Sequence, residues 1–381
     1  MSLNKRQMYH DDPVVIVSVA RTPMGGFQGD LKSLTAPQLG SAAIGAAVEH
    51  AGLAQTDIDE VLFGCVLPAG LGQAPARQAA LGAGLSNGTR CTTLNKMCGS
   101  GMQAAIMAHD MLLAGSADII VAGGMESMSN APYLLDKARS GYRMGHAQVI
   151  DHMFLDGLED AYERGRLMGT FAEECAAFEG FSREAQDAFA LASLTRAQEA
   201  IKRGHFDAEI VALHVTVGKE QKVVRHDEQP PKARLDKIAG LKPAFREGGT
   251  VTAANSSSIS DGAAALTLML QSEAKRRGLT PLATIRGHAA YANQPGLFPT
   301  APVGAIEALM SKTGWSLDEV DLFEINEAFA VVALVTMSKL GLSHEKVKVH
   351  GGACALGHPI GASGARIIVT LLSALRQRGL Q

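Results

Sequence analysis

Short apolar runs rich in β-branched residues alternate along this chain with alanine-rich stretches whose apolar positions recur at helical spacing. This alternation is typical of βα units and predicts an α/β fold with a mainly parallel sheet. In the first third of the chain we expect strands at 13–20, 60–65, 91–95 and 118–124, and helices at 35–51, 73–84 and from the glycine-rich Cys98–Gly101 to Gly115. In the last third we expect strands at 282–289, 320–325 and 347–351, and helices at 302–313, 329–340 and 363–377.

The middle of the chain has a different pattern, with more charged residues and fewer β-branched runs. Here we expect a helix at 182–203, because Ser182 is a favourable N-cap, and a surface loop at 229–231. We interpret this region as an insertion between two α/β halves. The predicted division is a first half made of 1–126 and 252–280, an inserted loop domain at 127–251, and a second half at 281–381.

The two predicted halves resemble each other. The segment IDEVLF at Ile58–Phe63 corresponds to LDEVDLF at Leu317–Phe323. Cys98 follows the first segment, and His358 the second, at the same distance and in a glycine-rich loop. This similarity indicates a duplicated unit, although two unrelated βα segments can agree to this extent by chance. A duplication implies that the second half stops before the counterpart of the strand at 118–124, so we expect the chain as given to be shortened.

Composition and charge exclude several classes of protein. Of the 381 residues, 46% are hydrophobic and 19% charged, which is too apolar for a disordered chain. A formal net charge of −3 provides no basic field for nucleic acid, and no apolar stretch is long enough to cross a bilayer. The start of the chain, Met1–Asp12, is polar, unlike a secretory signal, and the 5 scattered cysteines form no disulfide framework. We therefore expect a cytoplasmic protein that binds neither nucleic acid nor membrane.

Cys98 is the first candidate catalytic residue. It lies in the segment NKMCGSGM, between a predicted strand and a predicted helix. Unpaired N–H groups at a helix N-terminus favour a thiolate, so we expect this position to lower the pKa of the thiol. The neighbouring glycines allow a substrate to approach the backbone closely. The alternative to a nucleophile is a small buried cysteine beside a tight turn.

His358 and Asn326 are further candidates. His358 lies among glycines in GGACALGHPIGASG, and a neutral imidazole there can take a proton from Cys98 or donate a hydrogen bond to an oxyanion. The duplication predicts that the loops of Cys98 and His358 lie on the same face. Asn326 follows the predicted strand DLFEI, where the sites of α/β proteins collect, and it can orient a water molecule. Its neighbour Glu327 is either a base or a charge that stabilises the start of the next helix.

Other features of the sequence argue against a bound metal or cofactor. The glycine pairs at 123–124 and 248–249 lack the frame of a phosphate-binding loop. The 12 histidines are dispersed and show no metal-binding spacing. We therefore expect no metal and no cofactor. Met153 and Phe298 are candidates for the lining of a binding tunnel, although such side chains more often belong to the core.

Together, the segments NKMCGSG, NEAFA and GGACALGHPIGASGAR resemble the motifs of the thiolases, and most closely those of the biosynthetic, short-chain acetyl-CoA acetyltransferases. The resemblance extends from Ala20–Gly29 (ARTPMGGFQG) through GGMESMS and GTVTAANSSSISDGAAA to the last predicted helix. It implies a duplicated α-β-α-β-α core of five layers with an inserted loop domain, and a homotetramer built as a dimer of dimers. The implied reaction, in fatty acid or ketone metabolism, is the reversible Claisen condensation of two acetyl-CoA to acetoacetyl-CoA and CoA, with CoA as substrate rather than cofactor.

The resemblance also implies roles for the catalytic candidates. Cys98 would accept the acyl group from a CoA thioester, and its main-chain N–H would bind the oxyanion of the acyl-enzyme. His358 would activate Cys98 and later help to bind the thioester oxygen. Asn326 would orient the water molecule that accompanies His358 in this oxyanion hole.

The binding residues are implied in the same way. Ser257 would contact the pantetheine arm of CoA, with Met153 and Phe298 nearby. This chain has three serines at Ser256–Ser258 where the family usually has Ala-Ser-Gly, and it has Phe298 where short-chain members often have Met. Four basic residues of the inserted region are either partners for the CoA phosphates or part of a solvated loop: Lys222, Arg225, Lys232 and Arg234.

In the family, a second cysteine in a C-terminal Cys-x-Gly-Gly-Gly loop removes the α-proton of the second thioester. The sequence as given ends before such a loop, and Cys354 does not match that position, so we expect Cys354 to have an apolar packing role. Two alternatives to a biosynthetic thiolase stay open. One is a degradative thiolase that cleaves longer 3-ketoacyl-CoA, and the other is a non-catalytic relative that binds acyl-CoA.

Overall fold

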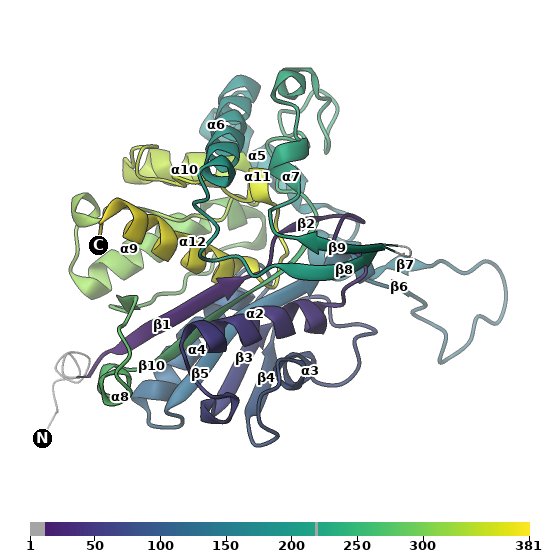
Figure 1. Cartoon of the computed structure of the whole chain (residues 1–381). Helices are drawn as coiled ribbons and strands as arrows, with labels where there is room; N and C mark the ends of the chain where they lie inside the picture. Colours follow the sequence, from purple (N-terminus) through teal and green to yellow (C-terminus); the bar gives the residue numbers. More distant parts are fainter. Residues whose placement is uncertain (1–11, 218–219) are drawn as a thin grey trace, which may run out of the picture.

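The computed structural model describes residues 12–217 and 220–381, so nearly all of the polar segment Met1–Asp12 lies outside the described residues. One large sheet with the strand order β11-β1-β10-β5-β3-β4 forms the centre, and β2 pairs with β10 (Figure 1). Its strands are β1 (Val14–Arg21), β2 (Gly25–Gly26), β3 (Glu60–Gly64), β4 (Arg90–Leu94), β5 (Ile119–Ser127), β10 (Ser260–Leu270) and β11 (Ala283–Thr284). Two hairpins lie apart from it, β6 (Tyr133–Leu134) with β7 (Ile150–Asp151) and β8 (Leu213–Val217) with β9 (Glu220–Val224).

The large sheet is mixed, so the prediction of a mainly parallel sheet is wrong. Strand β3 runs parallel to β4 and β5, but β10 runs antiparallel to both β1 and β5. Strand β10 lies between two strands of the first third of the chain, after the whole inserted region. The alternating pattern of strands and helices describes local connections only, and it gives no sign of a strand that returns from so far along the chain.

Alternate side chains of the strands face two layers of helices. On one face, Val15, Phe63 and Val121 pack against α2 (Ala36–His50) and α3 (Pro75–Gly82). On the other face, Ile16, Leu62 and Ile120 pack against α4 (Ser100–Leu113) and α12 (Ser363–Arg378). Because successive side chains of a strand point to opposite faces, a strand covered on both sides is apolar throughout, which explains the continuous apolar runs of the sequence.

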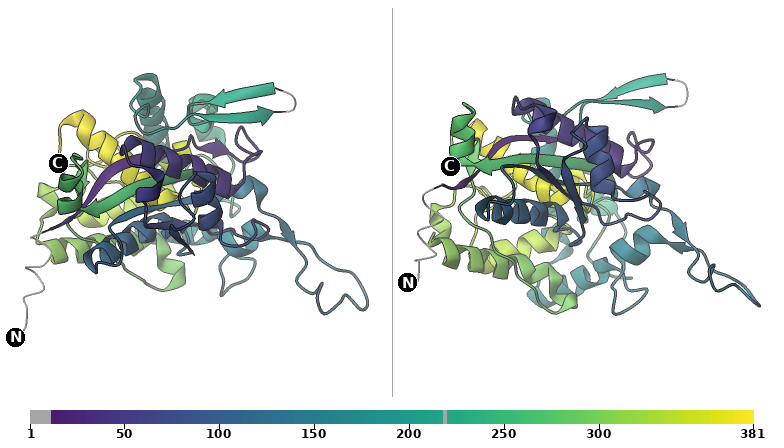
Figure 2. Two further views of the ribbon diagram at one scale, coloured as in Figure 1. Left: turned by 60° about the horizontal axis from the view of Figure 1, so that its bottom comes forward. Right: turned by 90° about the horizontal axis from the view of Figure 1, so that it is seen from below.

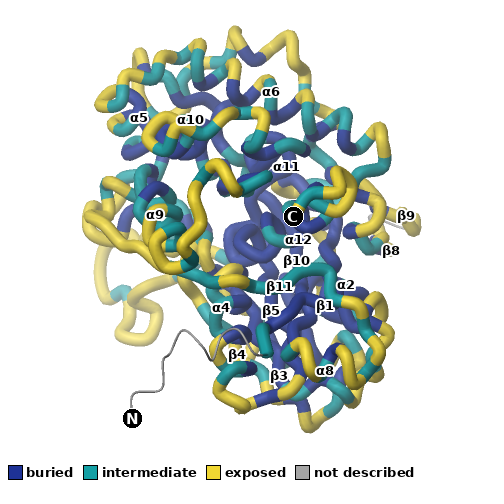
Figure 3. The backbone as a smooth tube through the Cα atoms, turned by 90° about the vertical axis from the view of Figure 1, so that its left-hand side faces the viewer, coloured by how far each residue is buried: buried dark blue, intermediate teal, exposed yellow. Residues whose placement is uncertain are grey.

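Helix α12 lies in the buried middle of the molecule, beside the sheet (Figure 3). It packs closely on α4: a Cβ atom on Gly101 would lie 2.7 Å from the backbone nitrogen of Ala365, and a Cβ on Gly364 would collide with Met102. Only glycine permits such an approach of two backbones. The contact brings together the loops that precede the two helices, those of Cys98 and His358, as the duplication predicts.

Most predicted helices are confirmed, including α6 in the inserted region, where Ser182 Oγ accepts a hydrogen bond of 3.2 Å from the Ala185 N–H. The surface loop predicted at 229–231 is wrong. Pro230 is buried in a short helix, and its carbonyl accepts a hydrogen bond from Gln198 of α6. Proline suits the first turn of a helix, where its missing N–H has no partner to lose.

The remaining helices and helical turns are α5 (Met168–Glu179), α6 (Arg183–Lys202), α7 (Gln229–Lys232), α8 (Gln271–Arg276), α9 (Ala301–Thr313), α10 (Ala330–Leu340), α11 (Ala353–Leu356), η1 (Gln55–Asp57), η2 (Met128–Asn130), η3 (Phe154–Leu158), η4 (Leu235–Gly240), η5 (Pro295–Thr300) and η6 (Leu317–Glu319).

The strands predicted for the last third of the chain are largely wrong. The segment 282–289 contributes only the short β11, and 320–325 and 347–351 form no strand. They meet at a single bridge, where Phe323 N–H donates to the Lys346 carbonyl at 2.8 Å and Lys348 N–H donates to the Phe323 carbonyl at 3.0 Å. The apolar runs are nevertheless buried, since Phe323 and Val347 share a cluster with side chains of α9 and α10. The apolar residues of these segments therefore indicate that the segments are buried. A ladder of backbone hydrogen bonds also requires a neighbouring strand.

The inserted region is held to the sheet by a buried charge cluster. Arg21, at the end of β1, is fully buried, and its guanidinium contacts Glu209 at 2.6 Å and Asp227 at 2.7 Å. It also lies over the ring of Phe206, 4.9 Å from the ring centroid. The contact of Arg21 with three residues of the segment 206–227 fixes that segment against the sheet.

A long loop leaves the body of the molecule between β6 and β7 (Figure 2). We call residues 135–149 the arm. Three of its apolar side chains are exposed: Leu135 by 51%, Met144 by 82% and Val149 by 61%. These three side chains are not packed into the core of their own chain.

Candidate active site

The loop before α4 presents Cys98 in a constrained conformation. Met97 has a φ of +49°, in the left-handed region that costs a non-glycine residue about 1–2 kcal/mol. Its N–H donates to Asn95 Oδ1 at 2.9 Å, and its carbonyl accepts from Ser100 Oγ at 2.6 Å. These bonds hold the strained turn, so that Cys98 sits two residues before the start of α4.

The surroundings of Cys98 are apolar. The thiol packs against a cluster that includes Val66, Met128, Met153 and Ile360. Burial raises the pKa of the Cys98 thiol to about 11; its own backbone N–H acts in the opposite direction, and the negative charge of Glu126 adds to the rise. The expectation of a lowered pKa at a helix N-terminus is therefore wrong for this protein, because the loss of hydration outweighs the field of the helix. At neutral pH the thiol is protonated and needs a base.

His358 is buried and electrically neutral. Its Nδ1 lies 2.5 Å from Ser363 Oγ, and the Ser363 hydroxyl in turn donates to the Pro359 carbonyl. Ser363 Oγ is therefore the acceptor from His358, which places the ring proton on Nδ1 and leaves the lone pair on Nε2. Burial lowers the pKa of His358 to about 3, and the positive charge of Arg366 acts in the same direction. A neutral ring with a free lone pair is what a base near a thiol requires.

Asn326 lies beside His358. Its Nδ2 is 3.4 Å from His358 Nε2, and within the described residues its buried Oδ1 has no hydrogen-bond partner. The pair is joined to a third loop, because the His358 backbone N–H donates to the Ser258 carbonyl at 3.1 Å. The structure thus brings Asn326, His358 and the serine segment together. An unpartnered amide oxygen beside the imidazole is suited to hold a water molecule.

The three predicted binding residues fall in different surroundings. Met153 is buried in the same cluster as Cys98, so it lines the wall beside the thiol. Ser257 is partly buried and is held by a 2.9 Å hydrogen bond from its N–H to the Ala328 carbonyl, two residues beyond Asn326. Phe298 belongs to another cluster, where its ring lies 6.2 Å from that of Phe329. Phe298 is linked to the site through its contact with Phe329, which lies in the same segment as Asn326.

Three of the four basic residues considered for the CoA phosphates already have carboxylate partners. Lys222 contacts Asp30 at 2.7 Å, Lys232 contacts Glu228, and Arg234 contacts Asp236 at 2.9 Å. Arg225 is exposed. This arrangement favours the solvated-loop alternative for Lys222, Lys232 and Arg234.

Two further candidates have structural roles. Glu327 is buried, and its carboxylate accepts hydrogen bonds from Ser193 Oγ at 2.9 Å and from the Cys354 N–H at 3.0 Å, so it holds the segment before His358 in place. Neither the base nor the helix-charge interpretation describes this position. Cys354 packs beside Ala330, Ala333 and Phe189, which confirms the packing role expected for it.

Glu126, at the end of β5, is a functional residue that sequence reasoning missed. Its carboxylate accepts hydrogen bonds from the backbone N–H groups of Val66 at 2.9 Å, Leu67 at 3.0 Å and Gly361 at 2.9 Å. Val66 and Leu67 pack around Cys98, and Gly361 lies in the His358 loop. One side chain therefore joins the segment after β3, which packs around Cys98, to the His358 loop. The signal was present in GGMESMS, where a lone carboxylate ends an apolar strand in the same way that Asn326 follows one.

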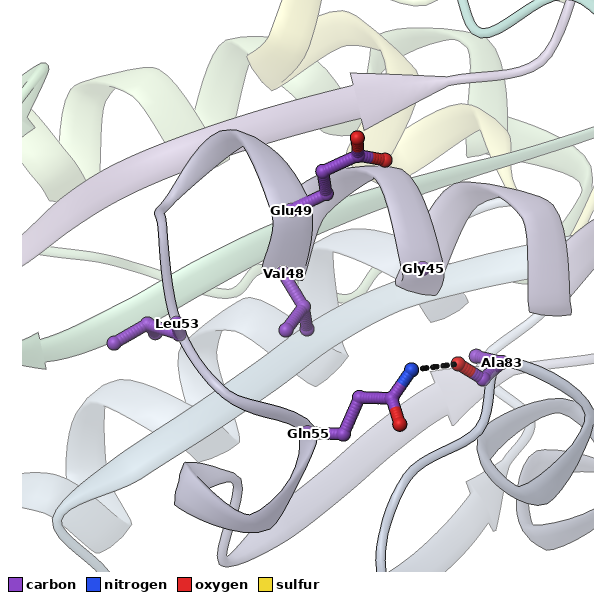
Figure 4. A pocket seen from close by; sticks show the side chains of 6 residues that line it. All are labelled: Gly45, Val48, Glu49, Leu53, Gln55 and Ala83. Atoms are coloured by element: carbon purple, nitrogen blue, oxygen red, sulfur yellow. Dashed lines mark hydrogen bonds between the residues drawn. The ribbon is translucent and has the colours of Figure 1, made fainter.

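Two pockets among the described residues lie away from Cys98 and His358. The pocket in Figure 4 lies between α2 and Ala83, where Gln55 Nε2 donates to the Ala83 carbonyl at 3.5 Å, and its one ionisable side chain is Glu49. A wider hollow between α5, η5 and α9 is lined in part by Gly296 and Pro299. Neither contains a thiol–imidazole pair, so neither competes with Cys98 and His358 as a reaction site.

Two family models together match nearly the whole chain. Residues 14–272 match the family described as thiolase, N-terminal domain, and residues 279–381 match thiolase, C-terminal domain. Acetyl-CoA acetyltransferase 2 of Arabidopsis thaliana is 50% identical, over 96% of this chain and 91% of that protein. A probable acetyl-CoA acetyltransferase of Dictyostelium discoideum is 47% identical, over 100% of this chain and 93% of its own length.

A solved structure agrees with these sequence comparisons. The crystal structure of the Bacillus anthracis acetyl-CoA acetyltransferase superimposes with a TM-score of 0.94, at 40% identity, over 97% of this chain and 94% of that one. Among the described residues, no helix is both long and apolar enough to span a bilayer.

Proposed function

Because this chain belongs to the thiolase family, we propose that it is an acetyl-CoA C-acetyltransferase, which interconverts two acetyl-CoA with acetoacetyl-CoA and CoA. The observation that carries this proposal is that a partly buried thiol, Cys98, packs against the cluster containing Ile360, in the same loop as the neutral imidazole of His358. The names of the relatives support acetyl-CoA as the substrate. No bound cofactor takes part in this proposal, since CoA enters and leaves as substrate and product.

The first half of the reaction transfers the acetyl group to Cys98. The thiol proton passes to His358 Nε2 while Sγ bonds to the carbonyl carbon of acetyl-CoA. The C–S bond to CoA then breaks, and the leaving thiolate takes the proton back from His358. With the pKa of Cys98 at about 11 and that of His358 at about 3, a resting ion pair is unfavourable, so proton transfer accompanies the attack. The Cys98 N–H receives the oxyanion of the acyl-enzyme.

The second half forms the carbon–carbon bond. A second acetyl-CoA loses an α-proton to a basic group of the site, and its enolate carbon attacks the acetyl carbonyl on Cys98. The C–S bond to Cys98 then breaks, acetoacetyl-CoA leaves, and the Cys98 thiolate takes up the proton, which restores the thiol. A water molecule oriented by Asn326 receives the thioester oxygen, together with His358 while its Nε2 carries a proton; the unpartnered Oδ1 of Asn326 within the described residues supports this role.

The other parts of the proposal concern binding and assembly. Ser257, Met153 and Phe298 contact the substrate, with Met153 nearest to the thiol because it shares the Cys98 cluster. The segments 1–126 with 252–280, 127–251 and 281–381 act as first half, loop domain and second half. The protein works as a cytoplasmic homotetramer in fatty acid or ketone metabolism, and the exposed apolar side chains of the arm support contacts between subunits.

Intact mass spectrometry after incubation with acetyl-CoA tests the first half-reaction. We expect one acetyl group per chain, mapped to Cys98 by peptide analysis. The variant Cys98→Ser should show no thioester, and His358→Ala should acetylate at least a hundredfold more slowly. The matched control Cys91→Ser removes a thiol at the far edge of the sheet and should acetylate at the wild-type rate. Acetylation elsewhere, or binding of CoA without acetylation, contradicts the proposal.

Two further measurements separate the alternatives. Exchange of acetyl-CoA methyl protons with solvent deuterium, together with release of acetoacetyl-CoA, reports the second half-reaction; neither occurs in a protein that only binds acyl-CoA. Thiolysis rates with acetoacetyl-CoA and with longer 3-ketoacyl-CoA then compare substrates. Failure to cleave acetoacetyl-CoA while longer chains react would favour a degradative thiolase instead.

A further inference from the structure

A cluster of metal-ligating side chains lies at the opposite end of α4 from Cys98. Asp110 Oδ1 accepts hydrogen bonds of 2.9 Å from His109 Nδ1 and 2.9 Å from His288 Nε2. The two rings are 5.1 Å apart between centroids and nearly perpendicular, at 81°. One ligand atom from each residue lies within 4.8 Å of the others. We propose that His109, Asp110 and His288 bind one divalent transition-metal ion, with Zn²⁺ as the ion that suits them best.

The donor set fits zinc chemically. Zinc in proteins takes imidazole nitrogen and carboxylate oxygen at about 2.0–2.2 Å, and catalytic zinc sites commonly have three protein ligands and an open position. Neighbouring ligands at such distances lie about 3–3.5 Å from each other, close to the 2.9 Å separations found here. Binding requires each imidazole to carry its proton on the other ring nitrogen, so it changes tautomers without a net loss of protons. Asp110 is 54% exposed, which gives an ion a path from solvent.

Some charges around the cluster oppose a bound cation and others favour it. Lys312 Nζ donates to the His288 carbonyl at 3.0 Å, so its positive charge opposes a bound ion. Asp110 lies in the last turn of α4 and His109 just before it, near the unpaired carbonyls of the helix end, which favour a positive charge. The partial negative charge of the helix end and the Asp110 carboxylate together offset the positive charge of Lys312.

The proposed ion lies far from Cys98. His109 is about 14 Å along the helix axis from the first residue of α4, at 1.5 Å per residue. His288 follows β11, whose neighbours Leu282 and Ile285 pack against the same cluster as α4. A cation at this position would fasten the end of α4 to the start of the C-terminal part. In the sequence these residues lie far apart, which is why dispersed histidines gave no metal-binding pattern.

Calorimetric titration of the chelator-treated full chain with ZnCl₂ tests the proposal. We expect one Zn²⁺ per chain for wild type, and binding at least tenfold weaker in His288→Ala and in Asp110→Asn. The control His146→Ala removes an exposed histidine of the arm and should bind as wild type does. Circular dichroism of each variant checks that it is folded, and the partly exposed His288 is the safer of the two substitutions.

Titration with Co²⁺ distinguishes this site from the free cysteines. A cobalt spectrum of nitrogen and oxygen ligands, without thiolate charge-transfer absorption, agrees with the proposal. We also expect zinc to raise the melting temperature of wild type and not that of His288→Ala. No zinc binding at micromolar concentration, an unchanged affinity in both variants, or a thiolate spectrum would each overturn the proposal.

Discussion

Glu126 shows at the scale of a residue how a buried carboxylate can organise a site without touching the substrate. It accepts hydrogen bonds from three backbone N–H groups, two in the segment after β3 that packs around Cys98 and one in the His358 loop. Burial raises its pKa from 4.5 to about 7, although the hydrogen bonds from Val66, Leu67 and Gly361 act in the opposite direction. The ionised form is thus the costlier one in the folded protein.

This raised pKa predicts a pH-dependent contribution to stability. Because the folded state holds the Glu126 proton more tightly than the unfolded state does, the contribution is complete below about pH 4.5 and is lost as pH rises to about 7. Relative to Glu126→Gln, the free energy of unfolding of wild type should therefore fall by roughly 3 kcal/mol across this interval. Urea unfolding at several pH values measures the difference. The exposed control Glu49→Gln should track wild type throughout, and a pH-independent difference for Glu126→Gln would contradict the assignment.

Single residues also show what could be predicted from the sequence. Cys98 and His358 could be found because glycine-rich loops leave few structural reasons for a thiol or an imidazole. The protonation state of Cys98 could not be predicted from the sequence. Its pKa depends on burial by Val66, Met153 and Ile360, which come from other parts of the chain. The tautomer of His358 likewise depends on Ser363 and on the carbonyl to which Ser363 donates.

At the scale of elements, β1 illustrates how a strand is joined to a distant segment. Its last residue, Arg21, is paired with the carboxylates of Glu209 and Asp227, and Asp227 also accepts the Met24 N–H at 2.8 Å. A buried cation of this kind depends on every partner, since the loss of one leaves charge uncompensated in a medium of low polarity.

We therefore predict that Asp227→Asn lowers the free energy of unfolding by about 3–5 kcal/mol. The matched control is Asp236→Asn, which breaks the exposed pair with Arg234 and should cost less than about 1 kcal/mol. Chemical unfolding followed by circular dichroism gives both values. Equal effects of the two substitutions would mean that the buried cluster contributes no more than a surface ion pair.

Elements differ in how well the sequence predicts them. Helices α2, α6 and α12 have caps and periodic apolar faces of their own, and their bounds agree closely with prediction. The segments 320–325 and 347–351 carry buried apolar residues as strands do, but pairing is a property of two segments and cannot be deduced from one. The antiparallel β10 escaped prediction for the same reason.

At the scale of the whole molecule, the arm stands out because no contact among the described residues of its own chain accounts for its exposed apolar side chains. Leu134 of β6 pairs with Ile150 of β7, so the two ends of the arm are adjacent. An Asn-Gly turn in place of residues 135–149 should therefore close the hairpin without disturbing the body. We predict that this deletion lowers the mass measured by light scattering from that of a tetramer, while Cys98 still accepts acetyl groups.

A control for this deletion keeps the arm and changes its charge. The double variant Lys137→Ser with Arg143→Ser should remain tetrameric if apolar contacts hold the subunits together. A deletion variant of unchanged mass would show that subunits associate through another surface.

The central position of α12 has a consequence for how the protein is made. Residues 363–378 leave the ribosome last among the described elements, yet they cover the sheet face formed by Ile16, Leu62 and Ile120. Until they arrive, that face of a sheet already synthesised has only α4 to shield it. The nascent chain therefore presents a broad apolar surface through most of its synthesis, and it is a natural client for a chaperone that holds such surfaces until translation ends.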